Sequence, residues 1–219
     1  YQLTKELLRN CSLSQYKHIN YKYFSSLSLD IYTDGCCRGN QFVEKQNSSA
    51  GWGIVIVSNE KSILEINGPV VLNEGSSDYL GAQLATNNIA ELTGIGEALL
   101  WISNSILTSL PEEMKSDLSN NLLDYEGIVY TDSEYAFKSI MGIYNGSKNR
   151  LIIERIRTMY LNLQDSLKVS PLLLRVPINK KDQIIRITNL RFQHVKGHSG
   201  NRWNDRADYL ANIGSQKTE

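Results

Sequence analysis

The 219-residue chain has few of the features that mark secreted or membrane-bound proteins. Its three cysteines are an odd number and too few for a disulfide framework, which favours a reducing, intracellular compartment. No apolar run approaches the roughly 20 residues that a membrane-spanning helix needs. The first ten residues, YQLTKELLRN, lack the apolar core of a signal peptide. The sequence does not separate nuclear, cytoplasmic and mitochondrial locations, and a targeting segment could precede Tyr1.

The chain also has no net charge, because 23 basic residues balance 23 acidic ones, and it has no internal repeats. This balance excludes a uniformly basic surface, although not a local basic face. Apolar residues make up 41% and charged residues 21% of the chain, which is an ordinary globular composition. We therefore expect one domain over residues 28–214, after an N-terminal extension (1–27, with a short helix near Lys5–Arg9) and before a tail (215–219).

Hydrophobic patterning predicts a mixed α/β domain. Alternating or continuous apolar runs predict strands, and three- and four-residue spacing predicts helices. The expected strands are 28–34, 51–60, 62–72, 127–133 and 189–195, and the expected helices are 87–102, 134–141, 151–163 and 203–214. Two segments interrupt this order, 103–126 and 170–188, and we interpret both as insertions, the second as a hairpin.

Two predicted strands end in the same three residues, Tyr-Thr-Asp, and so place Asp34 and Asp132 at strand ends. In open α/β sheets, ligands bind at the carboxyl ends of the strands. Each aspartate alone has a simpler explanation, since an aspartate after a strand often caps a helix or forms a turn. The pair therefore indicates a site only together with other residues.

Three further residues are candidates for the same chemistry. Glu91 falls on the apolar face of the predicted helix 87–102, where a charge is costly unless it is paired or binds a metal; alternatively, it satisfies N–H groups of the first helical turn. His198 lies between glycines, which suits a mobile proton carrier as well as an exposed loop residue. Asp208 lies on the last predicted helix, where a surface role is the simpler interpretation.

Together these residues predict more than any of them alone. Four carboxylates at one sheet edge would repel each other, and divalent cations would neutralise them. Oxygen ligands select Mg²⁺ or Mn²⁺. Two such ions about 4 Å apart can activate water and stabilise the leaving oxygen in phosphodiester hydrolysis.

The pattern resembles the type 1 ribonuclease H family, of the kind found in eukaryotic ribonuclease H1 catalytic domains. The matching pieces are YTDGCC (32–37) with Asn40, TNNIAEL (86–92), YTDS (130–133), and HVKGHSG (194–200) with Asn204, Ala207, Asp208, Leu210 and Ala211. They occur in the family's order from about residue 28 to 214. The resemblance implies a five-stranded mixed sheet flanked by helices, and endonucleolytic cleavage of the RNA strand of an RNA/DNA hybrid that leaves a 5′-phosphate.

The resemblance also implies roles for individual residues. Asp34, Glu91, Asp132 and Asp208 match the ligands of two Mg²⁺ ions, which Mn²⁺ can replace, and His198 matches a histidine that assists proton transfer. Asn40, Asn87 and Asn88 match residues that contact ribose 2′-hydroxyls, the groups that distinguish RNA from DNA. Thr86 matches a residue that holds a phosphate of the DNA strand. No membrane or obligate protein partner is expected, and the expected state is a monomer.

The sequence departs from the family in regions that bind substrate. The Trp-rich basic protrusion is replaced by the short segment 144–150, and Leu84 stands where an arginine is common. Between residues 138 and 191, eleven basic and three acidic residues give a charge of +8, which predicts a phosphate-binding face or only a solvated surface. Three alternatives stay open: an inactive hybrid-binding module, a domain of a retroelement polymerase, and a DNA-strand transferase or junction nuclease with this fold.

Overall fold

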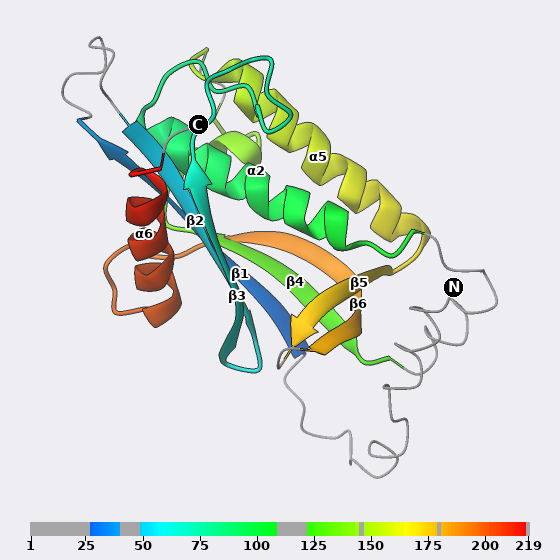
Figure 1. Cartoon of the computed structure of the whole chain (residues 1–219). Helices are drawn as coiled ribbons and strands as arrows, with labels where there is room; N and C mark the ends of the chain where they lie inside the picture. Colours follow the sequence, from blue (N-terminus) through cyan, green and yellow to red (C-terminus); the bar gives the residue numbers. More distant parts are fainter. Residues whose placement is uncertain (1–26, 40–48, 109–121, 145–146, 179–180, 218–219) are drawn as a thin grey trace.

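The computed structural model describes residues 27–39, 49–108, 122–144, 147–178 and 181–217. A mixed sheet lies at the centre, with helices on both faces (Figure 1). The strands are β1 (Leu27–Arg38), β2 (Ser49–Ser58), β3 (Lys61–Pro69), β4 (Asp124–Thr131), β5 (Leu172–Ile178) and β6 (Lys181–His194). The helices are α2 (Asn87–Ser105), α4 (Glu134–Ile140), α5 (Arg150–Val169) and α6 (Arg202–Gly214).

Strand β1 lies near the middle of the sheet, whose order is β3-β2-β1-β4-β6-β5. It pairs antiparallel with β2 and parallel with β4, with Thr33 opposite Thr131. The parallel pairing brings the carboxyl ends of β1 and β4 to the same edge. The two Tyr-Thr-Asp sequences therefore end side by side, as the sequence pattern predicts.

The sheet has six strands, so the expectation of five is wrong. The predicted inserted hairpin is real, but it belongs to the sheet: β5 pairs antiparallel with the first half of β6. Strand β6 then continues without a break to His194 and pairs with β4. Leu172, Leu174 and Val176 of β5 are buried in the main core, which explains why this segment extends the sheet instead of leaving it.

The two faces of the sheet are covered to different extents. Helices α2 and α5 pack against each other over one face, where the largest group of buried apolar residues lies (Figure 1). On the other face, α6 contacts β1, β2 and β3, and Ala207 and Leu210 pack against Tyr32, Val55 and Val57. Helices thus pack on both faces of the sheet at β1, the strand that carries Asp34.

Several sequence-based expectations fall on residues outside the described ranges. These are the N-terminal extension with its helix near Lys5–Arg9, the middle of the 103–126 segment, and Asn40. Among the described helices, none has the length and apolar character needed to cross a membrane.

Candidate metal centre

Three carboxylates meet at the shared edge of β1 and β4. Asp34 lies within β1 near its carboxyl end, Asp132 directly follows β4, and Glu91 comes from the first turns of α2. One ligand oxygen from each lies within 4.8 Å of the others. Asp34 and Glu91 are each only 6% exposed. The structure thus brings together three of the four predicted metal ligands in a largely buried place.

The close approach of α2 to β1 depends on Gly35. A Cβ atom at this position would lie 2.1 Å from the backbone nitrogen of Glu91, which is far inside contact distance. Only glycine therefore lets the helix bring Glu91 beside Asp34. The N–H of Gly35 also donates to Oδ1 of Asp34 at 2.7 Å, which fixes the orientation of that carboxylate.

Burial and mutual repulsion make ionisation of these carboxylates unfavourable. Burial, followed by the charge of Asp132, raises the pKa of Asp34 to about 7. Burial also raises the pKa of Glu91 well above its ordinary value, with contributions from Asp34 and Asp132. Within the described ranges, no ion pair joins a lysine or arginine to any of the three. Among the described residues, no lysine or arginine therefore balances the charge of this cluster.

The donor set fits a hard divalent cation. Glu91 Oε2 is buried and has no hydrogen-bond partner among the residues that the structure describes. An unpartnered carboxylate oxygen is costly in a protein interior, and binding to a cation would remove that cost. Carboxylate oxygens are the ligands that Mg²⁺ and Mn²⁺ prefer.

Asp208, the fourth predicted ligand, lies beside this group rather than in it. It is half-buried on α6, and its charge contributes to the raised pKa of Asp34. Its Oδ1 accepts a hydrogen bond from the amide of Asn212 at 3.1 Å. The structure thus places Asp208 near the cluster without including it in the closest set of three.

Asp132 has two close neighbours, Asn204 and Gly197, to which the sequence alone assigns no role. Asn204, 3% exposed on α6, donates from Nδ2 to Asp132 Oδ2 at 2.9 Å. A Cβ atom at Gly197 would lie 2.7 Å from the same oxygen, so this position also favours glycine. The four-residue spacing of Asn204, Asp208 and Asn212 on one helix is the signal in the sequence that could have identified these asparagines.

The two histidines near Asp132 differ in their surroundings. His194 Nε2 lies 3.1 Å from the backbone oxygen of Asp132. His198 is exposed and has a positive φ of 51°, in a loop that begins after β6. Gly197, the residue before His198, lies close to Asp132, because a Cβ atom added there would be 2.7 Å from Asp132 Oδ2, so the exposed His198 follows directly on a residue beside the cluster.

Comparison with known proteins agrees with this geometry. The sequence model of the RNase H family matches residues 27–216, which is most of the chain. The chain belongs to the ribonuclease H family. This confirms the predicted family and the predicted enzyme class, a ribonuclease H.

Individual relatives cover nearly all of the described fold. The Ribonuclease H of Clostridium botulinum is 29% identical over 83% of this chain and 91% of its own length. That of Chlorobium phaeovibrioides is 29% identical over 86% of this chain and 96% of its own. The structure of LC11-RNase H1, isolated from compost, matches 86% of this chain and 96% of its own with a TM-score of 0.50 and 21% identity, which supports the fold.

The residues predicted to bind substrate in this ribonuclease H lie around the start of α2. Thr86 caps the helix, its hydroxyl accepting from the N–H of Ile89. Asn87 Nδ2 lies 3.5 Å from Glu91 Oε1, whereas Asn88 is exposed. Thr86 and Asn88 line one pocket together with Lys148 and Arg150. Thr86 and Asn88 thus lie together in one pocket, and Asn87 lies beside Glu91 of the carboxylate cluster. Asn40 is outside the described residues.

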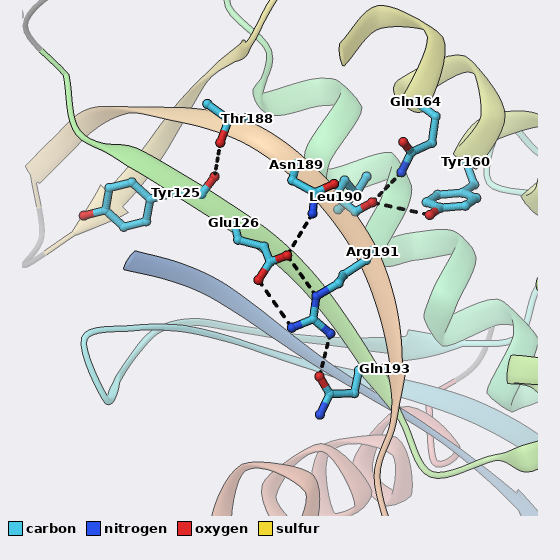
Figure 2. A network of polar contacts seen from close by, with 9 residues as sticks. All are labelled: Tyr125, Glu126, Tyr160, Gln164, Thr188, Asn189, Leu190, Arg191 and Gln193. Carbon is cyan, nitrogen blue, oxygen red and sulfur yellow. Dashed lines mark hydrogen bonds and ion pairs between the residues drawn. The ribbon is translucent and has the colours of Figure 1, made fainter. Parts of the chain in front are cut away.

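The basic run between residues 138 and 191 does not form one continuous free surface. Most of its cations pair with carboxylates: Lys138 with Glu134, Arg150 with Glu154, Lys168 with Asp165, Arg175 with Asp182, Arg186 with Asp124 and Arg191 with Glu126. Figure 2 shows Arg191 lying against Glu126 and Gln193 on β4 and β6. The counted charge of +8 therefore overstates what is available to bind phosphate.

Proposed function

We propose that this chain is an endonuclease that hydrolyses the RNA strand of an RNA/DNA hybrid with two Mg²⁺ ions, which Mn²⁺ can replace, and leaves a 5′-phosphate. The observation that carries the proposal is the largely buried group of Asp34, Glu91 and Asp132, with a Glu91 oxygen that has no hydrogen-bond partner among the described residues. The catalytic domain corresponds to residues 28–214. All four proposed ligands come from one chain, which supports a monomer, and the few cysteines support an intracellular location.

The proposed metal ligands are Asp34, Glu91, Asp132 and Asp208. Bound there, divalent ions supply Lewis-acid activation of water and stabilisation of the leaving oxygen. The protein contributes a rigid frame for them, since β1, α2 and α6 each carry one carboxylate and the fourth, Asp132, directly follows β4. A ring nitrogen of His198 on its exposed loop carries a proton to the leaving oxygen, which suits a residue that is tethered but solvated.

Substrate selection is proposed to involve the residues at the start of α2. The amide of Asn88 is exposed and can both donate to and accept from a ribose 2′-hydroxyl. Asn87 is proposed to contact the same strand beside Glu91, and Asn40 completes the predicted set. Thr86 can still donate its hydroxyl proton to a phosphate, because its oxygen only accepts in the helix cap. Lys148 in the same pocket adds positive charge.

The direct test is cleavage of end-labelled RNA in four settings: RNA/DNA hybrid, single-stranded RNA, double-stranded RNA and, with labelled DNA, double-stranded DNA. We expect Mg²⁺-dependent internal cuts in the hybrid alone, and none in EDTA. Asp132→Asn serves as the inactive control. Hybrid binding without cleavage by the wild type would favour an inactive binding module, and equal cleavage of duplex DNA would contradict the assignment.

A further inference from the structure

Helix α6 carries three polar residues in one stripe: Asn204, Asp208 and Asn212 follow each other at intervals of four. Residues four apart lie on the same face of a helix. Asn204 donates to Asp132 and Asn212 donates to Asp208, so each asparagine amide holds one proposed metal ligand. The stripe therefore supplies one carboxylate and two amides to the same site.

Asn212 makes contacts on both sides of its amide. Its Nδ2 lies 3.1 Å from Asp208 Oδ1 and 3.1 Å from the backbone oxygen of Asp208. Its Oδ1 accepts from the thiol of Cys36 on β1, with Sγ and Oδ1 3.2 Å apart. The side chain of Ser215 also lies within hydrogen-bonding reach of this thiol. The contact with Cys36 joins residues 176 positions apart in the sequence and links α6 to the strand that carries Asp34.

We propose that Asn212 is a positioning residue for Asp208, and that the Cys36 thiol sets the direction in which its amide points. The proposal rests on the proposed function, since it assumes that Asp208 helps to hold a divalent cation. An asparagine amide has a donor end and an acceptor end. With the thiol donating to Oδ1, the NH₂ group must face Asp208, leaving Asp208 Oδ2 to bind a cation.

The comparison with Asn204 supports a separate role for the thiol. Asn204 Oδ1 is buried and has no partner within the part of the chain that the structure describes, so its orientation depends on Asp132 alone. Asn212 is only half-buried, so its side-chain amide is less restrained by packing than the buried amide of Asn204. A fixed donor from a neighbouring strand removes that freedom. Contacts of this kind behind metal ligands typically change metal affinity or activity by 10–100-fold when they are lost.

The first test removes the amide. Asn212→Leu preserves the approximate size and helix propensity of the side chain, and Asn212→Ala is the second variant should the leucine not fold. We expect either variant to weaken Mn²⁺ binding about tenfold in calorimetry without substrate, and to raise the Mg²⁺ concentration for half-maximal cleavage similarly. The KM for hybrid should change less than twofold. Asn189→Ala is the matched control, because its amide also binds a carboxylate, Glu126, away from the site.

The second test asks whether Asn212 acts through Asp208. In an Asp208→Asn background, Asn212→Leu should have no further effect on Mn²⁺ affinity, because the ligand that it positions is already lost. Cys36→Ser preserves a donor and should retain most of the affinity, whereas Cys36→Ala should lose part of it. Additive losses in the double variant, or equal Mn²⁺ affinity in wild type and Asn212→Leu, would overturn the positioning role. Failure of the wild type to bind Mn²⁺ would instead overturn the proposed function.

Discussion

The carboxylates around the carboxyl end of β1 differ from those on β4 in what surrounds them. Asp34 and Glu91 are buried beside other carboxylates, and burial raises the pKa of both. Glu126 on β4 accepts from Arg191 and from Asn189, and the Arg191 side chain lowers its pKa (Figure 2). In the part of the chain that the structure describes, no cation pairs with Asp34 or Glu91, whereas Arg191 pairs with Glu126.

The presence or absence of a paired cation distinguishes the candidate metal site at Asp34 and Glu91 from the sheet surface at Glu126. A paired carboxylate on an exposed sheet contributes modestly to stability and has no spare charge. A buried carboxylate without a paired cation costs stability, and a bound divalent cation would remove that cost. The total charge of zero conceals this separation, because cations of the 138–191 run pair with carboxylates outside the site.

The largest effect on the cleavage rate should come from removing one carboxylate charge from the cluster of Asp34, Glu91 and Asp132. Asp34→Asn should lower kcat for hybrid cleavage by at least about 10³-fold, because the metal ions provide several kcal/mol of charge stabilisation. Hybrid binding should stay within about threefold of wild type. In EDTA at pH 8 the variant should also melt at a higher temperature, because a repulsive charge has been removed. Single-turnover cleavage and thermal unfolding measure the two effects, and near-wild-type cleavage would contradict the ligand assignment.

A smaller loss is expected from the proton carrier. His198→Ala should lower kcat by about 10²-fold, at the low end of what general acid–base catalysis contributes. Its ring is exposed and lies outside the cluster, so Mn²⁺ affinity should not change. Calorimetry beside a pH–rate profile tests both parts. Loss of metal binding in this variant would make His198 a ligand.

The stability of the folded protein should depend on pH through the buried carboxyl group of Asp34. The folded-state pKa of Asp34 is about 7, above its ordinary value of 3.8, so between these values the folded protein binds more protons than the unfolded one. In EDTA, stability should therefore fall as pH rises from about 4 to 7, lowering the melting temperature by about 3 °C or more. Saturating Mg²⁺ should remove most of this fall. Melting curves at several pH values test this, with Asp34→Asn expected to show a shallower slope.

The smallest effect is expected from removing the charge of Glu126, which pairs with Arg191 on the sheet. Glu126→Gln should lower the free energy of unfolding by about 0.5 kcal/mol, because partly exposed ion pairs contribute little. Cleavage should stay within twofold of wild type, since Glu126 lies on the sheet away from the metal cluster. Urea unfolding and the hybrid assay measure both. A tenfold loss of activity would show that the two regions are coupled.

Much of the fold could be predicted from the sequence, because local patterns determine it. Apolar alternation predicts β1, and the two Tyr-Thr-Asp sequences predict that Asp34 and Asp132 end strands, although β1 continues past Asp34 to Arg38. The sixth strand was missed because the 170–188 segment resembles an insertion when its pairing is unknown. The contact of Cys36 with Asn212, and the approach of α2 at Gly35, depend on tertiary packing that residue spacing does not report.

The assignment of Asp34, Glu91 and Asp132 as the metal centre is tested most directly by calorimetric titration of Mn²⁺. The titration compares the wild-type protein with Glu91→Gln, without nucleic acid and at pH 8. Glu91→Gln keeps the size of the side chain but removes the charge of the carboxylate whose buried oxygen has no partner in the described part of the chain. We predict saturable Mn²⁺ binding by the wild type and at least a tenfold weaker affinity in the variant. Equal affinities in the two proteins, with both folded, would contradict the assignment of this cluster as the metal centre.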